Sequence, residues 1–157
     1  MSLARNSTIT SSTFLLVNFV PFRLNRLADA VSRDLSEIYR DRFGLEIPEW
    51  RVLVTVGQRR ECTAQHVAAS TRMHKTRVSR AVASLTERKL IERVSCIEDG
   101  RELRLCLTKA GNKVYEVLVP LALERERTLL AKMSAGHLEG FIAALLELED
   151  ALGLNGE

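Results

Sequence analysis

The feature that most constrains the fold is a change of hydrophobic period after Lys89. Upstream of it, Val78, Val82 and Leu85 recur at helical spacing and predict an amphipathic helix over 74–88. Downstream, the stretch 103–107 alternates leucine with other residues, as a half-buried strand does. Leu90 to Ile97 is its expected partner, because the Asp-Gly pair between them is a strong hairpin signal. A helix followed by a two-stranded β wing is therefore expected.

Two shorter helices are expected ahead of this one. Pro48 can open a helix that we expect to end at Gly57, and Thr63 can cap another over 64–70. A short turn separates the latter from the helix that begins near residue 74. Two helices joined by a tight turn and followed by a hairpin make a winged helix-turn-helix, which we place at 47–108.

Long amphipathic helices are expected on both sides of this unit. A helix over 21–43 would be about 35 Å long, more than a small domain needs to cover its core. Near the C-terminus, apolar residues from Leu138 to Leu152 recur at coiled-coil-like spacing. We therefore expect a disordered tail over 1–13 and one mainly α (α+β) domain over 14–157. Within that domain, long dimerisation helices would occupy segments 14–46 and 109–157.

Positive charge is concentrated in the middle of the chain. The net charge is +3, but residues 51–104 carry 12 Lys/Arg against 6 Asp/Glu, and residues 62–86 include no acidic residue. Such a block indicates contact with a polyanion, although a solvated cationic helix face is the simpler alternative. The major groove of double-stranded DNA is about 12 Å wide and admits one helix. The candidate DNA-binding residues on helix 74–88 are His74, Lys75, Thr76, Arg77, Ser79, Arg80 and Ser84.

Three further DNA-binding candidates lie outside this helix. Thr63 and Gln65 stand at the start of the third helix, where unpaired backbone N–H groups suit a phosphate oxygen. Arg101, in the wing turn, could reach a narrow minor groove, and we expect Asp99 to form an ion pair with it.

The sequence offers no sign of catalysis or of a cofactor. It contains no Gly-rich phosphate loop, paired-His metal motif or Gly-x-Ser-x-Gly elbow. The three cysteines, Cys62, Cys96 and Cys106, lack metal-ligand spacing and fit a reduced cytoplasmic protein. The chain shows neither a secretory signal nor an apolar run of membrane length. We expect a cytoplasmic protein that is not an enzyme and has no metal, cofactor or membrane partner.

The stretch 47–111 resembles the MarR (multiple antibiotic resistance regulator) family. The resemblance rests on "IPEWRVLVTV", on "KTRVSRAVASLTERKLIER" followed by Asp-Gly-Arg, and on "LCLTKAG". The sequence departs from the family pattern at two positions. Lys89 stands where glycine commonly ends the recognition helix, and His74 stands where serine commonly caps it.

This resemblance implies a homodimeric transcription regulator held together by its first and last helices. Such a dimer binds a pseudo-palindromic operator, commonly as a repressor, and is often released by a small aromatic or phenolic effector. Family effector sites usually lie where the dimer helices meet the winged domain. The candidate effector-binding residues there are Phe22, Arg26, Trp50 and Tyr115.

Two alternatives stay open at this point. One is a redox-sensing regulator of the same fold, because Cys62 follows Arg60 and precedes a helix start, which could lower the pKa of its thiol. The other is a helical protein-interaction module without specific DNA binding. That module would keep the dimer helices but would not need the cationic face.

Overall fold

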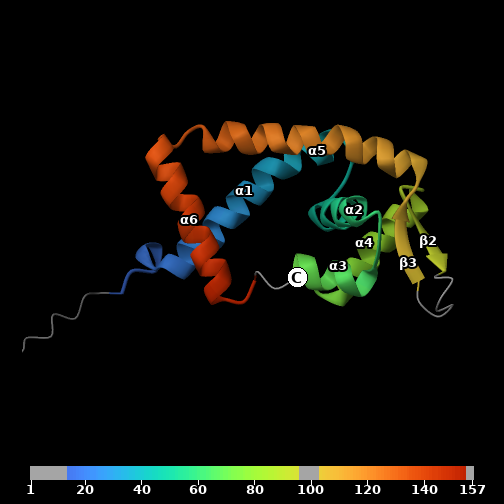
Figure 1. Ribbon diagram of the computed structural model, residues 1–157, viewed down its shortest axis with the longest axis horizontal. Helices are drawn as coiled ribbons and strands as arrows, with labels where there is room; N and C mark the ends of the chain where they lie inside the picture. Colours follow the sequence, from blue (N-terminus) through green and yellow to red (C-terminus); the bar gives the residue numbers. More distant parts are fainter. Residues whose placement is uncertain (1–13, 96–102, 155–157) are drawn as a thin grey trace, which may run out of the picture. The chain divides into compact units, whose positions relative to one another are not determined.

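The computed structural model describes residues 14–95 and 103–154 (Figure 1). The predicted N-terminal tail and the wing turn with Asp99 and Arg101 lie outside these residues, so the expected ion pair is not described. The described chain divides into two compact units, one ending at Asp34 and the other beginning at Leu35. This boundary falls inside helix α1 (Val20–Phe43), which was predicted over 21–43.

The first unit consists of a short 3-10 helix, η1 (Leu16–Asn18), and the first half of α1. Phe14 and Phe19 contact each other edge to face, with ring centroids 5.5 Å apart. Most apolar side chains of this unit are exposed, including Val17, Leu24 and Leu27. The unit thus has little core of its own.

The second unit contains the predicted winged helix-turn-helix. Its elements are α2 (Ile47–Arg59), β1 (Glu61–Thr63), α3 (Ala64–Thr71), α4 (Lys75–Glu87), β2 (Ile91–Ser95), β3 (Leu103–Leu107), α5 (Lys109–Leu130) and α6 (Ala135–Ala151). Its core combines side chains from α2, α3, α4, α5 and the sheet: Val52, Leu53, Val56, Val67, Val78, Val82, Leu85, Ile91, Leu105 and Leu118. The predicted fold class is confirmed.

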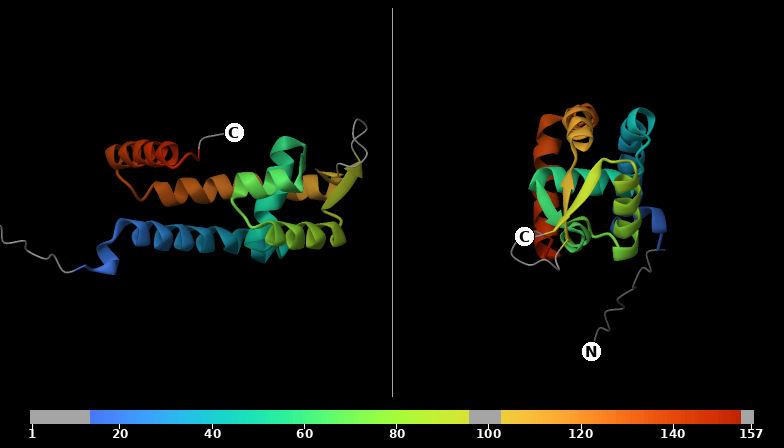
Figure 2. Two further views of the ribbon diagram at one scale, coloured as in Figure 1. Left: turned by 90° about the horizontal axis from the view of Figure 1, so that it is seen from below. Right: turned by 90° about the vertical axis from the view of Figure 1, so that its right-hand side faces the viewer.

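The sheet has one strand more than the sequence predicted. Its order is β1-β3-β2, with both pairs antiparallel, and Leu105 lies opposite Cys62 on one side and Arg93 on the other. Strand β1 is three residues long, so it carries almost no periodic signal of its own. Figure 2 shows β2 and β3 extending from the end of this unit where α5 begins.

Gly57 does not end its helix, as the sequence had suggested, but lies inside α2, which continues to Arg59. A Cβ atom at this position would lie 2.5 Å from two ring carbons of Tyr115 on α5. The glycine therefore permits close approach of α2 and α5, and this packing outweighs the low helix propensity of glycine.

The end of α4 explains the unusual residue at position 89. Lys89 has φ 57°, in the left-handed region that favours glycine. The Leu90 N–H donates to the Leu85 carbonyl at 2.9 Å, and the Lys89 N–H donates to that of Thr86 at 2.9 Å. This is the Schellman arrangement that glycine usually completes, and a lysine there costs about 1 kcal/mol.

None of the described helices is by itself long and apolar enough to span a membrane. Only α5 and α6 taken together pass that test of length and composition, and they are bent by 117° relative to each other.

Candidate nucleic-acid interface

The start of α4 is fixed by a cap and a tight turn. Arg72, which ends α3, adopts a left-handed conformation with φ 54°, and Met73 is buried. His74 then caps α4, because its Nδ1 accepts a hydrogen bond from the Thr76 N–H at 3.3 Å. Histidine thus fills the capping position where serine is usual, and its ring is tied to the helix start.

One face of α4 is buried against the domain, as its periodicity predicted. Val78, Ala81, Val82 and Leu85 are each at most 4% exposed. These side chains pack into the core with residues from α2 and α3. The rotation of α4 about its own axis is therefore fixed, and its opposite face is held towards solvent.

The opposite face carries most of the predicted contact residues. Lys75, Thr76, Arg77, Ser79 and Arg80 are all exposed. Within the described parts of the chain, the charged groups of Lys75, Arg77 and Arg80 form no ion pair. We call these five residues the α4 cationic face. Unneutralised guanidinium and ammonium groups beside short hydroxyls can donate to phosphate or to guanine.

Ser84, which the sequence grouped with these residues, lies further along α4 and is less exposed than they are. Its side chain is half-buried, and its Oγ donates to Oε1 of Glu49 on α2 at 2.5 Å. Its hydroxyl is thus engaged within the domain. Only the position of Glu49 in space identifies this role, and Glu49 is far away in the sequence.

The predicted contacts on α3 are arranged as a helix start. The Thr63 Oγ1 accepts a hydrogen bond from the His66 N–H at 3.0 Å, which confirms that Thr63 caps the helix. Gln65 is exposed in the first turn.

The four candidate effector residues are divided between the two units. Phe22 and Arg26 contact each other in the first unit, with the guanidinium carbon 5.7 Å from the ring centroid. In the second unit, Trp50 stacks on buried Tyr39 with centroids 5.3 Å apart, and the Tyr115 ring lies against Gly57. Trp50 and Tyr115 therefore have packing roles of their own.

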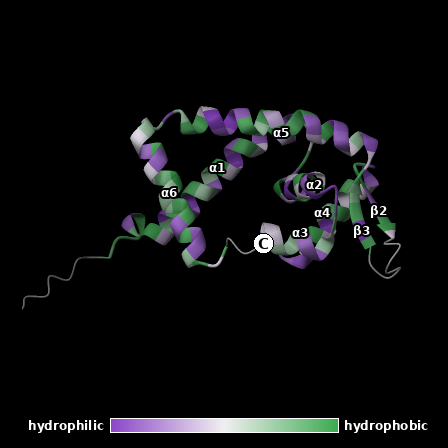
Figure 3. Ribbon diagram, viewed as in Figure 1, coloured by the Kyte–Doolittle hydropathy of each residue, from purple (hydrophilic) through white to green (hydrophobic). Residues whose placement is uncertain are grey.

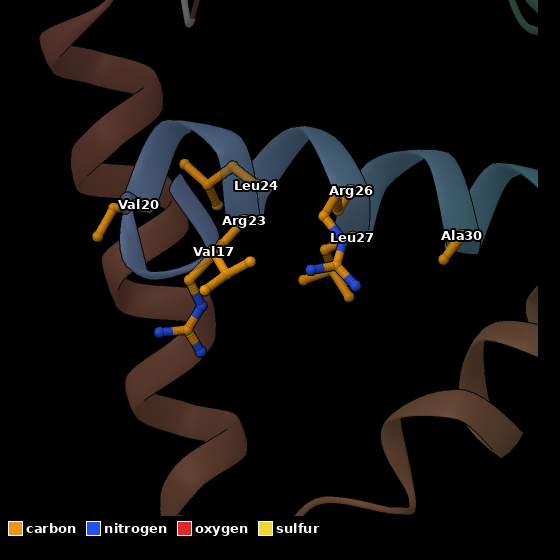
Figure 4. Close-up of a pocket in the computed structure, with 7 residues that line it drawn as sticks. All are labelled: Val17, Val20, Arg23, Leu24, Arg26, Leu27 and Ala30. Carbon is orange, nitrogen blue, oxygen red and sulfur yellow. The ribbon is translucent and has the colours of Figure 1, made fainter. Parts of the chain in front are cut away.

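A hollow of about 500 Å³ lies on the first unit (Figure 4). It is lined by Val17, Val20, Arg23, Leu24, Arg26, Leu27 and Ala30. In Figure 4, Arg23, Arg26 and Leu27 project from the same side of α1. Arg26 was among the sequence candidates but Arg23 was missed, although it stands three residues earlier and so lies on nearly the same helix face.

The two described cysteines of the sheet, Cys62 and Cys106, are buried and half-buried, respectively. Cys62 is only 8% exposed, and burial raises the pKa of its thiol above the ordinary value. The positive charge of Arg59 offsets part of that rise. Burial also raises the pKa of Cys106, whereas Cys96 lies outside the described residues. The expectation of a lowered pKa at Cys62 is therefore wrong, because desolvation outweighs the effect of the nearby arginine.

Cys62 is accordingly expected to react slowly with iodoacetamide at neutral pH. With Cys96 and Cys106 replaced by serine, the pH midpoint of its alkylation rate should lie above the value of about 8.5 for a free thiol. The same protein in denaturant is the control and should return to the ordinary midpoint. A native midpoint below that of the denatured chain would contradict this expectation and favour thiol sensing.

No group of three or more side chains that could hold a metal ion occurs among the residues that the structure describes. The arrangement of charged and hydroxyl groups on α4 therefore remains the principal candidate site.

Comparison with known proteins bears on what this site does. A family model described as the MarR family matches residues 43–102, which include α2 to β2. No curated protein matches the chain by sequence.

Several solved structures share the fold. The chain is 28% identical to a MarR/EmrR family transcriptional regulator from Acinetobacter sp. ADP1, with a TM-score of 0.79 over 89% of this chain and 99% of that one. It is 26% identical to a probable transcriptional regulator from Pseudomonas aeruginosa, with a TM-score of 0.72 over 85% and 99% of the two chains. BpsR from Bordetella bronchiseptica, at 19% identity, shares the fold with a TM-score of 0.76 over 87% and 97%. Over residues 43–102 the chain thus matches the MarR family, and it shares its winged-helix fold with transcriptional regulators of that family.

Proposed function

We propose that the protein is a homodimer that binds a specific DNA operator through the α4 cationic face, most simply as a repressor. The observation that carries this proposal is the charge of Lys75, Arg77 and Arg80, which no described residue neutralises, on the exposed side of a helix whose other side is buried. Arginine and lysine can donate to guanine O6 and N7 or to phosphate, and hydroxyls can serve either partner. Thr63 and Gln65 at the start of α3, and Arg101 in the wing turn, are proposed as flanking contacts.

The homodimer is supported by the apolar surface of α6. This helix has no buried residue, and its exposed side chains include Ile142, Leu146 and Leu148, with Leu152 directly after the helix. Figure 3 shows hydrophobic residues along the length of α6. An apolar helix face of this kind needs a partner, and a second copy of the chain would supply one. Two-fold symmetry would then present two α4 helices to successive major grooves about 34 Å apart.

A small aromatic or phenolic effector would release this dimer from its operator. DNA binding by BpsR is regulated by 6-hydroxynicotinic acid. In this chain the hollow on the first unit combines Arg23 and Arg26 with apolar side chains such as Leu27, a lining that suits an acid with an aromatic body. Repression follows if the bound dimer blocks a promoter.

The test is selection of duplexes from random or genomic DNA, followed by quantitative binding at two salt concentrations. We expect an enriched pseudo-palindromic site and a steep salt dependence. Arg77→Ala and Arg80→Ala should each weaken binding to that site about tenfold, the cost of one good base or phosphate contact.

Arg127→Ala is the matched control, because it removes one positive charge from α5, where Arg127 is paired with Glu124 at 2.6 Å. It should bind the enriched site like the wild type. If no sequence is enriched and both α4 variants behave like Arg127→Ala, the operator proposal is wrong and a protein-interaction module becomes the better explanation.

A further inference from the structure

A buried carboxylate links the end of α4 to the corner between α1 and α2. Glu49, on α2, is 8% exposed. Its Oε1 accepts a hydrogen bond from Ser84 at 2.5 Å, and its Oε2 lies 3.8 Å from Nη1 of Arg88. Ser84 is in the last turn of α4, and Arg88 directly follows that helix. We call Glu49, Ser84 and Arg88 the Glu49 cluster.

The cluster also holds the backbone at the corner. The Glu46 N–H donates to Glu49 Oε2 at 2.7 Å, which closes a capping box at the start of α2. The Arg88 guanidinium donates to the carbonyl of Gly44 at 3.1 Å and to that of Phe43. These carbonyls lie at the end of α1, where no further helical turn supplies N–H donors. One arginine thus caps α1 and approaches the buried carboxylate.

Each residue of the Glu49 cluster has a hydrogen-bond or ion-pair partner. A buried carboxylate without partners would be costly, but here both oxygens of Glu49 have them. The partners come from three segments: the end of α1, the start of α2 and the end of α4. The guanidinium group of Arg88 is planar, and its N–H donors point in fixed directions. Its contacts therefore restrict both the distance and the relative orientation of the ends of α1 and α4.

The Glu49 cluster lies at one end of α4 and the α4 cationic face begins at the other, so a small tilt of the helix at the cluster displaces the cationic face. Thr76 and Arg88 are about 18 Å apart along the helix axis, so a tilt of about 5° at the cluster would move Thr76 by about 1.6 Å. Hydrogen bonds to base edges require donor–acceptor distances of about 2.7 to 3.2 Å. Flexible side chains can still follow phosphates over such a displacement, whereas direct base contacts are lost.

We propose that Glu49, Ser84 and Arg88 are positioning residues that set the orientation of α4 for sequence reading and do not themselves touch DNA. This inference rests on the proposed operator binding. It assigns Ser84 a role different from the base contact that its sequence position suggested, and it gives Arg88 a role separate from the α4 cationic face.

The experiment compares Ser84→Ala, Arg88→Lys and the wild type on the enriched duplex and on a random duplex, at two salt concentrations. Arg88→Lys keeps the positive charge but removes the fork, and Ser84→Ala changes no charge at all. We expect the ratio of specific to random affinity to fall about 5- to 100-fold in each variant, the range of one lost base contact. The salt slope should stay within about 0.5 of the wild-type value, because no phosphate contact is lost.

Other outcomes would overturn the proposal. If Ser84→Ala lowers the melting temperature but leaves the affinity ratio unchanged, the cluster only stabilises the fold. If Arg88→Lys retains the wild-type ratio of specific to random affinity, the forked guanidinium of Arg88 is not needed to orient α4. If Arg88→Met weakens binding to both duplexes equally and reduces the salt slope by about one, Arg88 contacts a phosphate. A wild-type protein without any site preference would instead refute the operator proposal, and this inference with it.

Discussion

Replacement of Gly111 by alanine is expected to lower the free energy of unfolding by about 3 kcal/mol or more, at the upper end of the cost of overpacking. Gly111 lies buried in the first turn of α5, and a Cβ atom there would be 1.9 Å from the carbonyl oxygen of Leu90. That oxygen cannot easily move, because it accepts a hydrogen bond from the Thr108 N–H at 3.1 Å. The Leu90 N–H is in turn bound to Leu85 at the end of α4. The added methyl group would therefore separate α5 from the segment that joins α4 to β2.

Chemical denaturation followed by far-UV circular dichroism measures this effect. Gly136→Ala is the matched control, since Gly136 also lies in the first turn of a helix but has no atom within 4 Å of the position that an added methyl group would take. Gly136→Ala should raise the free energy of unfolding by about 1 kcal/mol or less, because alanine has a higher helix propensity than glycine. If Gly111→Ala does not lower the free energy of unfolding, the close approach of α5 to Leu90 is not a feature of the folded protein.

The parts of the fold that the sequence predicted are those specified by local pattern. Helix α4 was predicted within one residue at each end, and its buried face consists of the residues that recur at helical spacing, such as Val78 and Leu85. The cap at Thr63 was also recognisable, because a hydroxyl at a helix start bonds an N–H only three residues away. Such contacts depend on the near sequence alone.

The parts that the sequence did not predict depend on residues that are distant along the chain. Gly57 looked like a helix end because its partner, Tyr115, is on α5. The hydrogen bond between Ser84 and Glu49 on α2 was not visible, nor was the burial of Cys62 in β1, which raises the pKa of its thiol. In each case tertiary packing decided the role, and no periodicity or spacing rule reports it.

The candidate site also has some features that the nearby sequence determines and others that depend on distant residues. Its charged members on α4 follow from composition and helical phase, so the sequence was sufficient to place Lys75, Arg77 and Arg80 on one exposed face. The arrangement that holds this face in position, through Arg88 and the corner between α1 and α2, is visible only in the structure.

Leu148→Glu is expected to convert the proposed dimer into a monomer and thereby weaken operator binding to that of a single half site. Leu148 is 47% exposed on α6, so a glutamate there should cost the isolated chain little. In the dimer, the same carboxylate would be removed from water opposite apolar side chains, without a partner for its charge. We expect the dimer dissociation constant to rise at least about 100-fold, because an unpaired buried charge costs several kcal/mol.

Sedimentation equilibrium measures the association, and binding to full and half operator duplexes measures its consequence. Ala143→Glu is the control, because it adds the same charge to α6 on the face away from the stripe that contains Leu148, and it should remain a dimer. The monomeric variant should bind full and half sites with equal and weak affinity, since only one α4 helix can engage either duplex. If Leu148→Glu stays dimeric and binds its operator like the wild type, α6 is not the dimer interface. If instead it is monomeric and still distinguishes the full site, DNA reading by this chain does not require two copies.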